Sequence, residues 1–321
     1  MREESGKGPL VVLVGPTAVG KTALAIELAL ALNGEVVTAD SMQVYKGMDI
    51  GTAKPTPSEM KGVPHHLIDV VTPDTPFNVA LYRDMAHRVI AEVHARGRVP
   101  IVSGGTGLYI RAVLDEFLFP DQGADPALRR RLQEMAAEHG PEHLYAMLVR
   151  VDPERAAELH PNDVRRVIRA LEVYEVTGRP MSEHIREAKA KSPRYRDVRI
   201  GLIRPRSELY ERINRRVDEQ LRRGLVEEVK TLRSRYPLQD TALQALGYKE
   251  IIAFLDGECS LDEAVRRLKR ETRRYAKRQL TWFRRDESIT WFDLSRYPSL
   301  DAATDAIRSH VVKVLPELAR P

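Results

Sequence analysis

LVVLVGPTAVGKT, at residues 10–22, is the most informative stretch of this chain. An apolar run at residues 10–14 precedes a glycine loop, and an Ala- and Leu-rich stretch follows at residues 21–32, which is the pattern of a strand, a loop and a helix. Residues 15–22 match G-x-x-x-x-G-K-[ST] at every fixed position, in the strand-to-helix context that gives this pattern its physical meaning. The stretch therefore predicts a P-loop.

Three further apolar runs extend this unit into a sheet. Residues 36–39 precede Asp40, residues 99–102 precede a second glycine turn, and residues 198–203 form a later core strand. Buried runs that alternate with helical stretches are typical of proteins with parallel strands. We predict an α/β fold, with a P-loop NTPase-like core built on a mainly parallel sheet.

The middle of the chain interrupts this alternation. Residues 119–126 are rich in Pro, Asp and Gly, and the sequence from there to about residue 193 is charged and helical in pattern, without a clear buried strand. We predict an all-helical insertion domain at residues 121–193, within a core formed by residues 1–120 and 194–321. The last part of that core is expected to consist mostly of amphipathic helices.

Composition limits the class of protein. The 321 residues are 43% hydrophobic and 30% charged, which is typical of a globular chain with a substantial core. No apolar stretch approaches the roughly 18 residues of a membrane span, and the single cysteine, Cys259, can form no disulfide within the chain. We expect a cytoplasmic monomer with no membrane partner.

Positive charge is concentrated near the C-terminal end. The net charge of +5 is weak evidence for a polyanionic partner, but residues 266–285 contain ten basic residues and one acidic residue. If a helix begins near Leu261, one of its faces consists of Val265, Leu268, Thr272, Tyr275, Gln279 and Trp282, and the arginines lie mostly on the others. The plain alternative to nucleic-acid contact is a solvated charged face.

The predicted loop has the chemistry of a diphosphate site. Backbone amides at a helix N-terminus point toward a bound phosphate, Lys21 adds positive charge, and the Thr22 hydroxyl is a candidate ligand for Mg²⁺. The residues expected to contact the diphosphate are Gly15, Pro16, Thr17, Ala18, Val19, Gly20, Lys21 and Thr22. The pattern alone does not decide the reaction.

A P-loop kinase or ATPase would add a carboxylate at the end of another strand to hold magnesium. The turn at residues 103–107, SGGTG, contains none, and instead offers backbone amides and the Thr106 hydroxyl to a diphosphate. Asp40 should face the loop from the C-terminal edge of the sheet, where a carboxylate could accept a proton or help to place magnesium. Its plain alternative is a turn cap.

Eight segments, taken in order, resemble the bacterial tRNA dimethylallyltransferases, also called tRNA isopentenyltransferases. The resemblance runs nearly from end to end, and the combination is specific to that family. The segments are GPTAVGKT at 15–22, DSMQVYKGMDIGTAKP at 40–55, VPHHLIDV at 63–70, GGTGLY at 104–109, HPNDVRRVIRALEV at 160–173, RINRRVD at 212–218, ALGYKE at 245–250 and YAKRQLTWFR at 275–284.

The resemblance implies transfer of a dimethylallyl group from dimethylallyl diphosphate to the exocyclic N6 amine of the adenosine 3′ of a tRNA anticodon, with Mg²⁺ as cofactor. Asp40 would be the general base, and Ser41 and Gln43 would read the adenine edge. The implied catalytic residues are Asp40, Thr22, Lys21, Thr106, Arg212 and Arg216.

The same resemblance implies contacts with the anticodon stem-loop, to which the insertion domain would add a basic group. The residues expected to bind tRNA are Asp40, Ser41, Met42, Gln43, Thr106, Arg165, Arg166, Arg169, Tyr248, Lys277, Arg278, Gln279 and Trp282. Two alternatives remain: a small-molecule kinase with ATP in the loop, and a nucleotide-gated RNA-binding protein without catalysis. The basic helix argues against the kinase. Asp40 and the second glycine turn argue against a binding protein without catalysis.

Overall fold

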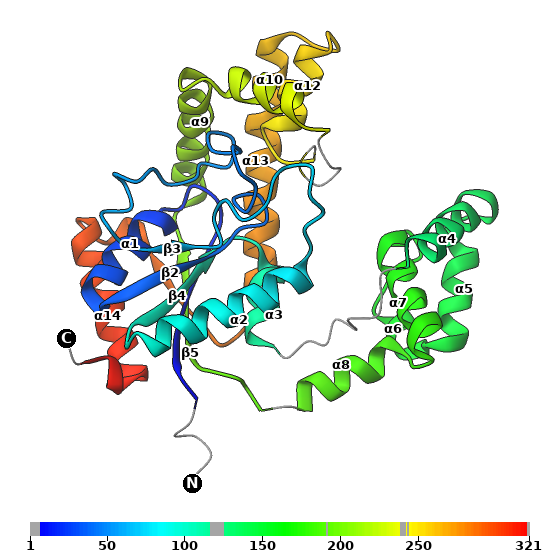
Figure 1. The fold of residues 1–321 in the computed structure, drawn as a ribbon, viewed down its shortest axis with the longest axis horizontal. Coiled ribbons are helices and arrows are strands. Elements are labelled where there is room, and N and C mark those ends of the chain that lie inside the picture. The colour runs from blue at the N-terminus through cyan, green and yellow to red at the C-terminus, as the bar shows by residue number, and fades with distance from the viewer. Residues whose placement is uncertain (1–6, 116–124, 191, 238–241, 243, 320–321) are drawn as a thin grey trace. The chain divides into compact units, whose positions relative to one another are not determined.

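The computed structural model describes residues 7–115, 125–190, 192–237, 242 and 244–319. The chain divides into two compact units (Figure 1): a core unit, Met1–Val113 with Tyr195–Pro321, and a helical unit, Leu114–Arg194. The boundary predicted between residues 120 and 121 lies outside the described residues. The other predicted boundary, between residues 193 and 194, falls beside Tyr195, where the core unit resumes.

The core unit contains a six-stranded sheet in which every described pairing is parallel. The register sets Val11 of the central strand opposite Ile101 on one side and Val198 on the other. The predicted parallel α/β fold is confirmed. In the order β3-β2-β4-β1-β5-β6, the strands are β1 (Pro9–Val14), β2 (Gly34–Ala39), β3 (His65–His66), β4 (Val99–Gly104), β5 (Arg196–Ile203) and β6 (Ile289–Asp293).

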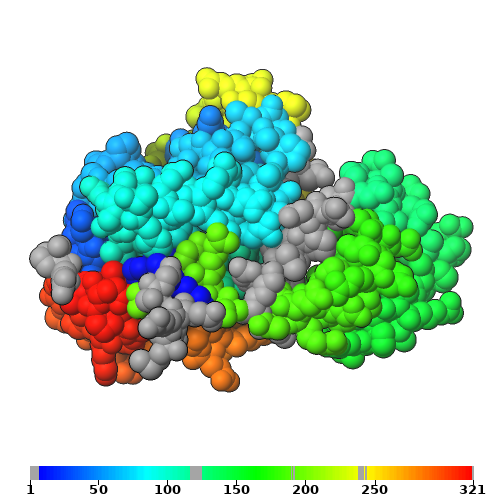
Figure 2. Space-filling model, turned by 60° about the horizontal axis from the view of Figure 1, so that its bottom comes forward, coloured from blue at the N-terminus to red at the C-terminus, as the bar shows by residue number. Residues whose placement is uncertain are grey.

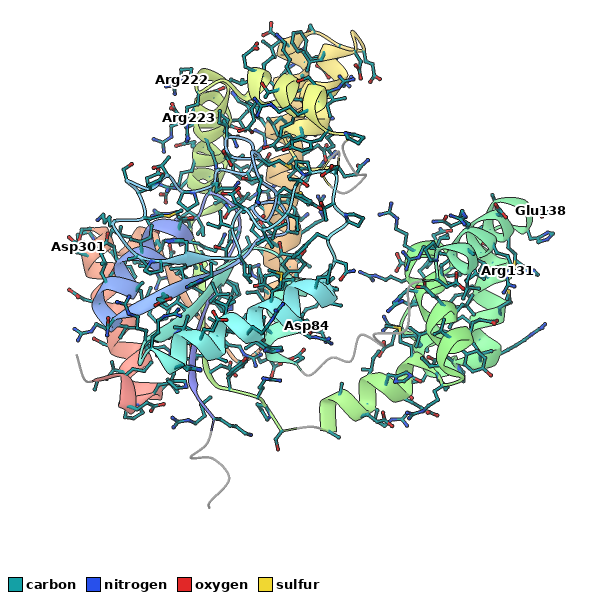
Figure 3. All side chains as sticks on the ribbon, in the orientation of Figure 1. Asp84, Arg131, Glu138, Arg222, Arg223 and Asp301 are labelled. Carbon is teal, nitrogen blue, oxygen red and sulfur yellow. The ribbon has the colours of Figure 1, made fainter. Side chains whose placement is uncertain are left out.

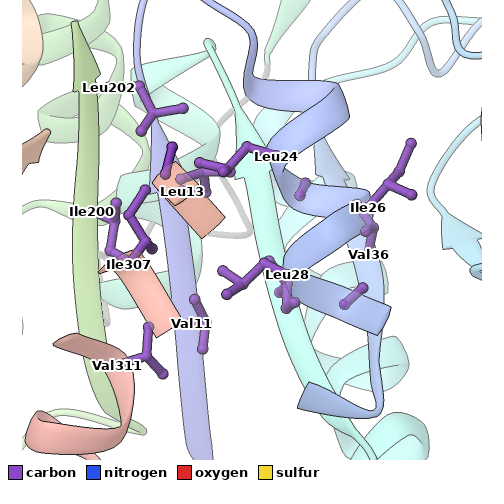
Figure 4. Packing of buried hydrophobic residues seen from close by; sticks show 14 of the residues in the cluster. Val11, Leu13, Leu24, Ile26, Leu28, Val36, Ile200, Leu202, Ile307 and Val311 are labelled. Carbon is purple, nitrogen blue, oxygen red and sulfur yellow. The ribbon is translucent and has the colours of Figure 1, made fainter. Parts of the chain in front are cut away.

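Helices cover the sheet. α1 (Lys21–Leu32) packs against α14 (Leu300–Val314), while α2 (Val79–Ala95) packs against β2 and β4 and is followed, after β4, by α3 (Gly107–Leu114). Burial of each large apolar side chain contributes roughly 1.5–3 kcal/mol to the stability of the fold. The packed helices and strands therefore hold in place the strand ends from which the loops project. The buried cluster shown in Figure 4 includes Val11, Leu13, Leu24, Leu28, Ile200, Ile307 and Val311.

Two edge strands differ from the sequence-based expectation. The segment after residue 203 is predicted to be mostly helical, yet β6 forms the last strand of the sheet there. Only Ile289 of its five residues is buried, so the strand lacks the apolar run of a central strand. β3 is only two residues long and pairs with Val36 and Val37 of β2.

A group of helices follows β5. In the space-filling view its yellow tip stands beside the blue segment that follows β2 (Figure 2). Glu228, in the same group of helices, accepts hydrogen bonds from that segment. α13 packs against both α9 and α12. The helices are α9 (Arg206–Arg222), α10 (Leu225–Arg235), α12 (Tyr248–Leu255) and α13 (Leu261–Phe283).

The buried face of α13 is rotated slightly from the predicted one. Val265, Tyr275 and Trp282, which the sequence places on that face, are half-buried at its edge. Their neighbours Ala264, Ala276 and Phe283 are buried instead, and the two alanines are too small to stand out in an apolar pattern. The buried residues are Ala264, Leu268, Thr272, Ala276, Gln279 and Phe283.

The described residues of the helical unit form no strand. Its core is a cluster that includes Leu132, Leu144, Leu148, Val167, Ile168 and Leu171. The helices are α4 (Pro126–His139), α5 (Pro141–Val151), α6 (Pro153–Ala157), α7 (Val164–Thr177) and α8 (Met181–Ala190). No helix in the described part of the chain combines the length and the apolar character needed to cross a membrane.

Candidate active site

The loop between β1 and α1 has the backbone geometry of an anion site. Gly20, the residue before α1, has a φ of 116°, and no side chain caps the first amides of the helix. At Gly15 a β-carbon would lie 2.8 Å from the Leu202 carbonyl oxygen, so glycine lets the loop pass close to β5. The uncapped amides remain available to a bound phosphate.

Lys21 reaches back beneath this loop. Its Nζ atom donates hydrogen bonds to the carbonyl oxygens of Gly15 (2.9 Å) and Pro16 (2.8 Å). Burial of the ammonium, and then the positive charge of Arg216, lower the pKa of Lys21 to about 7, while Asp40 acts in the opposite direction. An anion bound at the loop would favour the charged form of Lys21.

Two arginines of α9 contact the same loop. Arg212 Nε donates to the Ala18 carbonyl oxygen (2.8 Å), and Arg216 Nη1 donates to the Thr17 hydroxyl (3.1 Å). The two arginines are four residues apart and therefore project from one face of the helix. Burial lowers the pKa of both guanidinium groups, so both positive charges are partly desolvated. Such charges beside free amides favour a polyanionic ligand.

Asp40 directly follows β2, at the C-terminal edge of the sheet. Its Oδ1 atom accepts hydrogen bonds from the amides of Met42 (2.9 Å) and Gln43 (3.3 Å). Among the described residues, no hydrogen-bond donor contacts Oδ2. Asp40 Oδ1 therefore caps the turn, as the plain alternative predicted, while Oδ2 is available to a substrate.

Thr106, in the turn after β4, lies next to Asp40. The Thr106 hydroxyl accepts a hydrogen bond from the Ser41 amide (3.1 Å). A β-carbon on Gly104 would collide with the Ala39 carbonyl, so glycine allows the ends of β2 and β4 to approach each other. This approach brings the second glycine turn to the carboxylate predicted as the base.

A cavity of about 820 Å³ joins the P-loop, Asp40, the two arginines of α9 and, from the second glycine turn, Gly104 and Gly105. It is large enough for a small diphosphate and part of a second substrate. Arg222 and Arg223, at the end of α9 (Figure 3), lie at its border. The lining includes Thr17, Ala18, Gly20, Lys21, Thr22, Asp40, Gln43, Gly104, Gly105, Arg212, Arg216, Tyr275 and Gln279.

The ten basic residues at positions 266–285, predicted to face a polyanionic partner, fall into two sets. Six make ion pairs or side-chain hydrogen bonds within the protein: Arg266, Arg267, Lys269, Arg270, Arg273 and Arg274. Lys277, Arg278, Arg284 and Arg285 are exposed and have no acidic partner among the described residues. The free positive charge is therefore confined to the C-terminal part of this segment.

Two residues predicted to contact tRNA are committed to contacts inside the core unit. Tyr248 is 1% exposed and donates its hydroxyl to Glu228, so its side chain is held inside the core unit, and its tRNA contact stays a prediction. Gln279 is buried, and both ends of its amide are engaged by the glycine loops. Trp282 is half-buried against Gly107.

The arginines predicted in the helical unit also differ from one another. Arg169 pairs with Glu172 (2.8 Å), a fully buried carboxylate that Arg129 contacts as well, so this arginine stabilises its own unit. Arg166 lies 3.6 Å from Asp163. Arg165 is exposed, without a partner in the described part of the chain, and is the free cation of the three.

Tyr275 lines the cavity and is a further residue of the site, beyond those predicted from the sequence. Burial raises its pKa to about 12, and its hydroxyl interacts with Thr106 and Gln279. The sequence contains a signal for this placement. Tyr275 lies four residues before the predicted site residue Gln279, and therefore on the same side of the helix.

Fold and site together define a P-loop α/β protein in which the phosphate loop shares a cavity with a carboxylate at the end of another strand. A family model described as IPP transferase matches residues 43–286. The chain belongs to this family, which confirms the resemblance seen in the sequence and makes the chain a prenyltransferase.

Individual relatives agree with the family. The chain is 54% identical over 287 residues to a tRNA dimethylallyltransferase of Halothermothrix orenii, a match covering 89% of this chain and 88% of that protein. It is 48% identical over 305 residues to the Bacillus subtilis tRNA dimethylallyltransferase, covering 95% and 97%.

Solved structures show the same similarity. The full-length tRNA isopentenylpyrophosphate transferase of Bacillus halodurans aligns with a TM-score of 0.73 at 47% identity, covering 98% of both chains. A eukaryotic dimethylallyltransferase acting on tRNA aligns with a TM-score of 0.80 at 32% identity, covering 94% of this chain and 78% of that one.

Proposed function

We propose that this chain transfers the dimethylallyl group of dimethylallyl diphosphate to the N6 amine of the adenosine 3′ of the anticodon in tRNA. The observation that carries the proposal is the single cavity shared by Asp40, the P-loop and the two arginines that contact it. Membership of the IPP transferase family supports the same reaction.

The P-loop would hold the diphosphate. Its uncapped amides, Lys21, Arg212 and Arg216 supply hydrogen bonds and positive charge. Thr106, at the second glycine turn, contacts Ser41 beside Asp40. Negative charge grows on the diphosphate as its bond to the allylic carbon breaks. Preorganised donors stabilise that charge more strongly in the transition state than in the ground state, which lowers the barrier.

Mg²⁺ fits this arrangement. The described residues contain no group of three or more His, Cys, Asp or Glu side chains that could hold a metal. Mg²⁺ needs no such group, because one or two protein oxygens together with substrate phosphates and water commonly suffice. We propose that the Thr22 hydroxyl holds the ion with the diphosphate, where its charge would help to neutralise the leaving group.

Asp40 would take the proton. The adenine amine is a weak nucleophile because its lone pair is delocalised, but the nitrogen becomes acidic as it bonds to the allylic carbon. The carbon–nitrogen bond forms, the carbon–oxygen bond to diphosphate breaks, and one amine proton moves to the free Oδ2 of Asp40. Oδ1 stays on the amides of Met42 and Gln43, which keeps the carboxylate in place.

The exposed basic residues would bind the nucleic acid. An adenine stacked in the anticodon loop must leave its stack to enter the cavity that contains Asp40, at a cost of roughly a few kcal/mol. Lys277 and Arg278 on α13, and Arg165 in the helical unit, are exposed cations without an acidic partner among the described residues. We expect their phosphate contacts to offset this cost.

Incubation with Mg²⁺, dimethylallyl diphosphate and unmodified tRNA, followed by mass analysis of the nucleosides, tests the function. We expect one adenosine per tRNA to gain a dimethylallyl group at the position 3′ of the anticodon. Omitting either substrate should abolish the product. An arm with ATP in place of the prenyl diphosphate tests the kinase alternative, and phosphate transfer without prenyl transfer would overturn the proposal.

A further inference from the structure

The Glu228 carboxylate on α10 holds a turn of the segment that follows β2. Three successive backbone amides donate to it, those of Asp49 (3.0 Å), Ile50 (2.7 Å) and Gly51 (3.0 Å). The Tyr248 hydroxyl on α12 donates to the same carboxylate at 2.6 Å. Successive amides that converge on one anion form a nest of the kind that binds phosphate. In this protein the anion is one of its own side chains.

A second helix holds the opposite side of this turn. Gln220 Nε2, on α9, donates to the carbonyl oxygens of Ile50 and Gly51, both at 2.8 Å. A β-carbon at Gly51 would collide with the Tyr248 ring, so the turn packs directly on that ring. Amides and carbonyls of the same turn are therefore fixed by two different helices.

The helix side chains behind this turn are buried, whereas Glu228 itself is half-buried and Asp49 is exposed. Tyr248 is 1% exposed and Gln220 is 8% exposed. Burial, and then the charge of Glu228, raise the pKa of Tyr248, so its hydroxyl stays protonated and remains a donor. Hydrogen bonds to a carboxylate in such surroundings are stronger than those between neutral groups.

The turn is connected to Asp40 through Gln43. Gln43 Nε2 donates to the carbonyl oxygens of Thr52 (3.2 Å) and Ala53 (3.5 Å), and the Gln43 amide donates to Asp40 Oδ1 (3.3 Å). Gln43, Thr52 and Ala53 line the cavity. Residues 41–64 contain no helix or strand, so their placement depends on such long-range contacts.

We propose that Glu228 is a positioning residue for prenyl transfer. It anchors residues 49–51, which places Thr52 and Ala53, and through Gln43 it sets the orientation of the Asp40 carboxylate. Glu228 acts only through these residues, because it is not part of the described cavity lining. The proposal rests on the proposed function, since its effect is on that reaction.

The variant Glu228→Gln tests the proposal at nearly constant side-chain volume. An amide nitrogen cannot accept a hydrogen bond, so at least one of the four donors loses its partner. We expect kcat at saturating substrates to fall about 10- to 100-fold, the usual effect of misplacing a catalytic group through its support. The affinity for dimethylallyl diphosphate should change less than about twofold, because the P-loop is held separately.

Two matched variants separate positioning from general damage. Glu227→Gln changes the neighbouring residue, which is exposed and pairs with Lys230, and should leave kcat within about twofold of the parent. Tyr248→Phe removes one donor and leaves the three amides on Glu228, so its loss of kcat should be smaller than that of Glu228→Gln.

Hydrogen–deuterium exchange supplies a readout independent of activity. In Glu228→Gln the amides of residues 41–53 should exchange faster, with the P-loop unchanged. Two results would overturn the positioning role and leave the proposed function intact. One is a kcat of Glu228→Gln equal to that of the parent; the other is a loss of kcat no larger than the fraction of the variant that is unfolded at the assay temperature. Absence of prenyl transfer by the parent protein would overturn the proposed function, and the positioning role with it.

Discussion

The Gln279 side-chain oxygen accepts a hydrogen bond of 2.8 Å from the backbone amide of Thr17, which ties the basic helix α13 directly to the P-loop. The other end of the Gln279 amide donates to the Gly105 carbonyl oxygen at 3.0 Å. One buried side chain thus joins the two glycine loops, while Lys277 and Arg278, two residues and one residue before it, are exposed. The same helix contributes to the loop geometry and to the positive surface.

Replacing Gln279 with Ala should lower the free energy of unfolding by about 1–3 kcal/mol, because a buried donor and a buried acceptor lose their partners. Binding of dimethylallyl diphosphate should weaken as the loop loses its support. Urea unfolding and a diphosphate titration measure the two effects. Thr281→Ala is the control, since the Thr281 hydroxyl bonds only within its own helix. Unchanged diphosphate affinity in Gln279→Ala would contradict a role in the loop.

Diphosphate binding should take up a proton above pH 7. The pKa of Lys21 is lowered to about 7 in the free protein, so the side chain is mostly neutral at pH 8.5. A bound diphosphate favours the charged form, and affinity should therefore fall between pH 7 and pH 9, by up to about tenfold per pH unit. Calorimetry in buffers of different ionisation enthalpy counts the protons. Equal proton uptake by the parent and by Lys21→Ala would rule out Lys21 as the group.

The variant Thr22→Ala should impair catalysis in a way that depends on magnesium. If the Thr22 hydroxyl holds Mg²⁺ beside the diphosphate, its removal should raise the magnesium concentration needed for half-maximal rate, and excess magnesium should restore only part of the activity. Thr22→Ser keeps the hydroxyl and should stay close to the parent. A magnesium response of Thr22→Ala identical to that of the parent would exclude Thr22 as a ligand.

The double variant Lys277→Ala/Arg278→Ala should weaken tRNA binding and flatten its salt dependence. Each lost phosphate contact reduces the slope of log affinity against log salt by roughly 0.7–0.9. Arg270→Ala/Arg274→Ala is the matched control: it removes the same charge from the same helix, but from residues that already pair with Glu271. We expect a smaller change of slope in the control. Equal slopes in the two double variants would mean that net charge, and not a specific contact, governs binding.

The sequence predicts those features of the structure that are determined by residues close together in the chain. The loop at residues 15–22 carries its own pattern, and Asp40 follows an apolar strand whose direction places it at the ligand edge of the sheet. β6 was missed because most of its residues are partly exposed at the edge of the sheet.

Contacts between distant segments left no local signal. Glu228 and Ile50 are 178 residues apart, and nothing in either segment predicts their hydrogen bond. In the same way, Arg165 and Arg169 are equivalent as letters in a basic stretch, yet only Arg169 faces the buried carboxylate of Glu172. Whether an arginine is free for a ligand depends on the packing that surrounds it.

The rate of a single turnover by Asp40→Asn tests the central claim most directly. Asparagine keeps an Oδ1 atom for the amides of Met42 and Gln43 but cannot take the amine proton. With saturating tRNA and dimethylallyl diphosphate, we predict a rate about 100- to 10,000-fold below that of the parent, with both substrates still binding at nearly parent affinity. A rate close to that of the parent would contradict the assignment of Asp40 as the base.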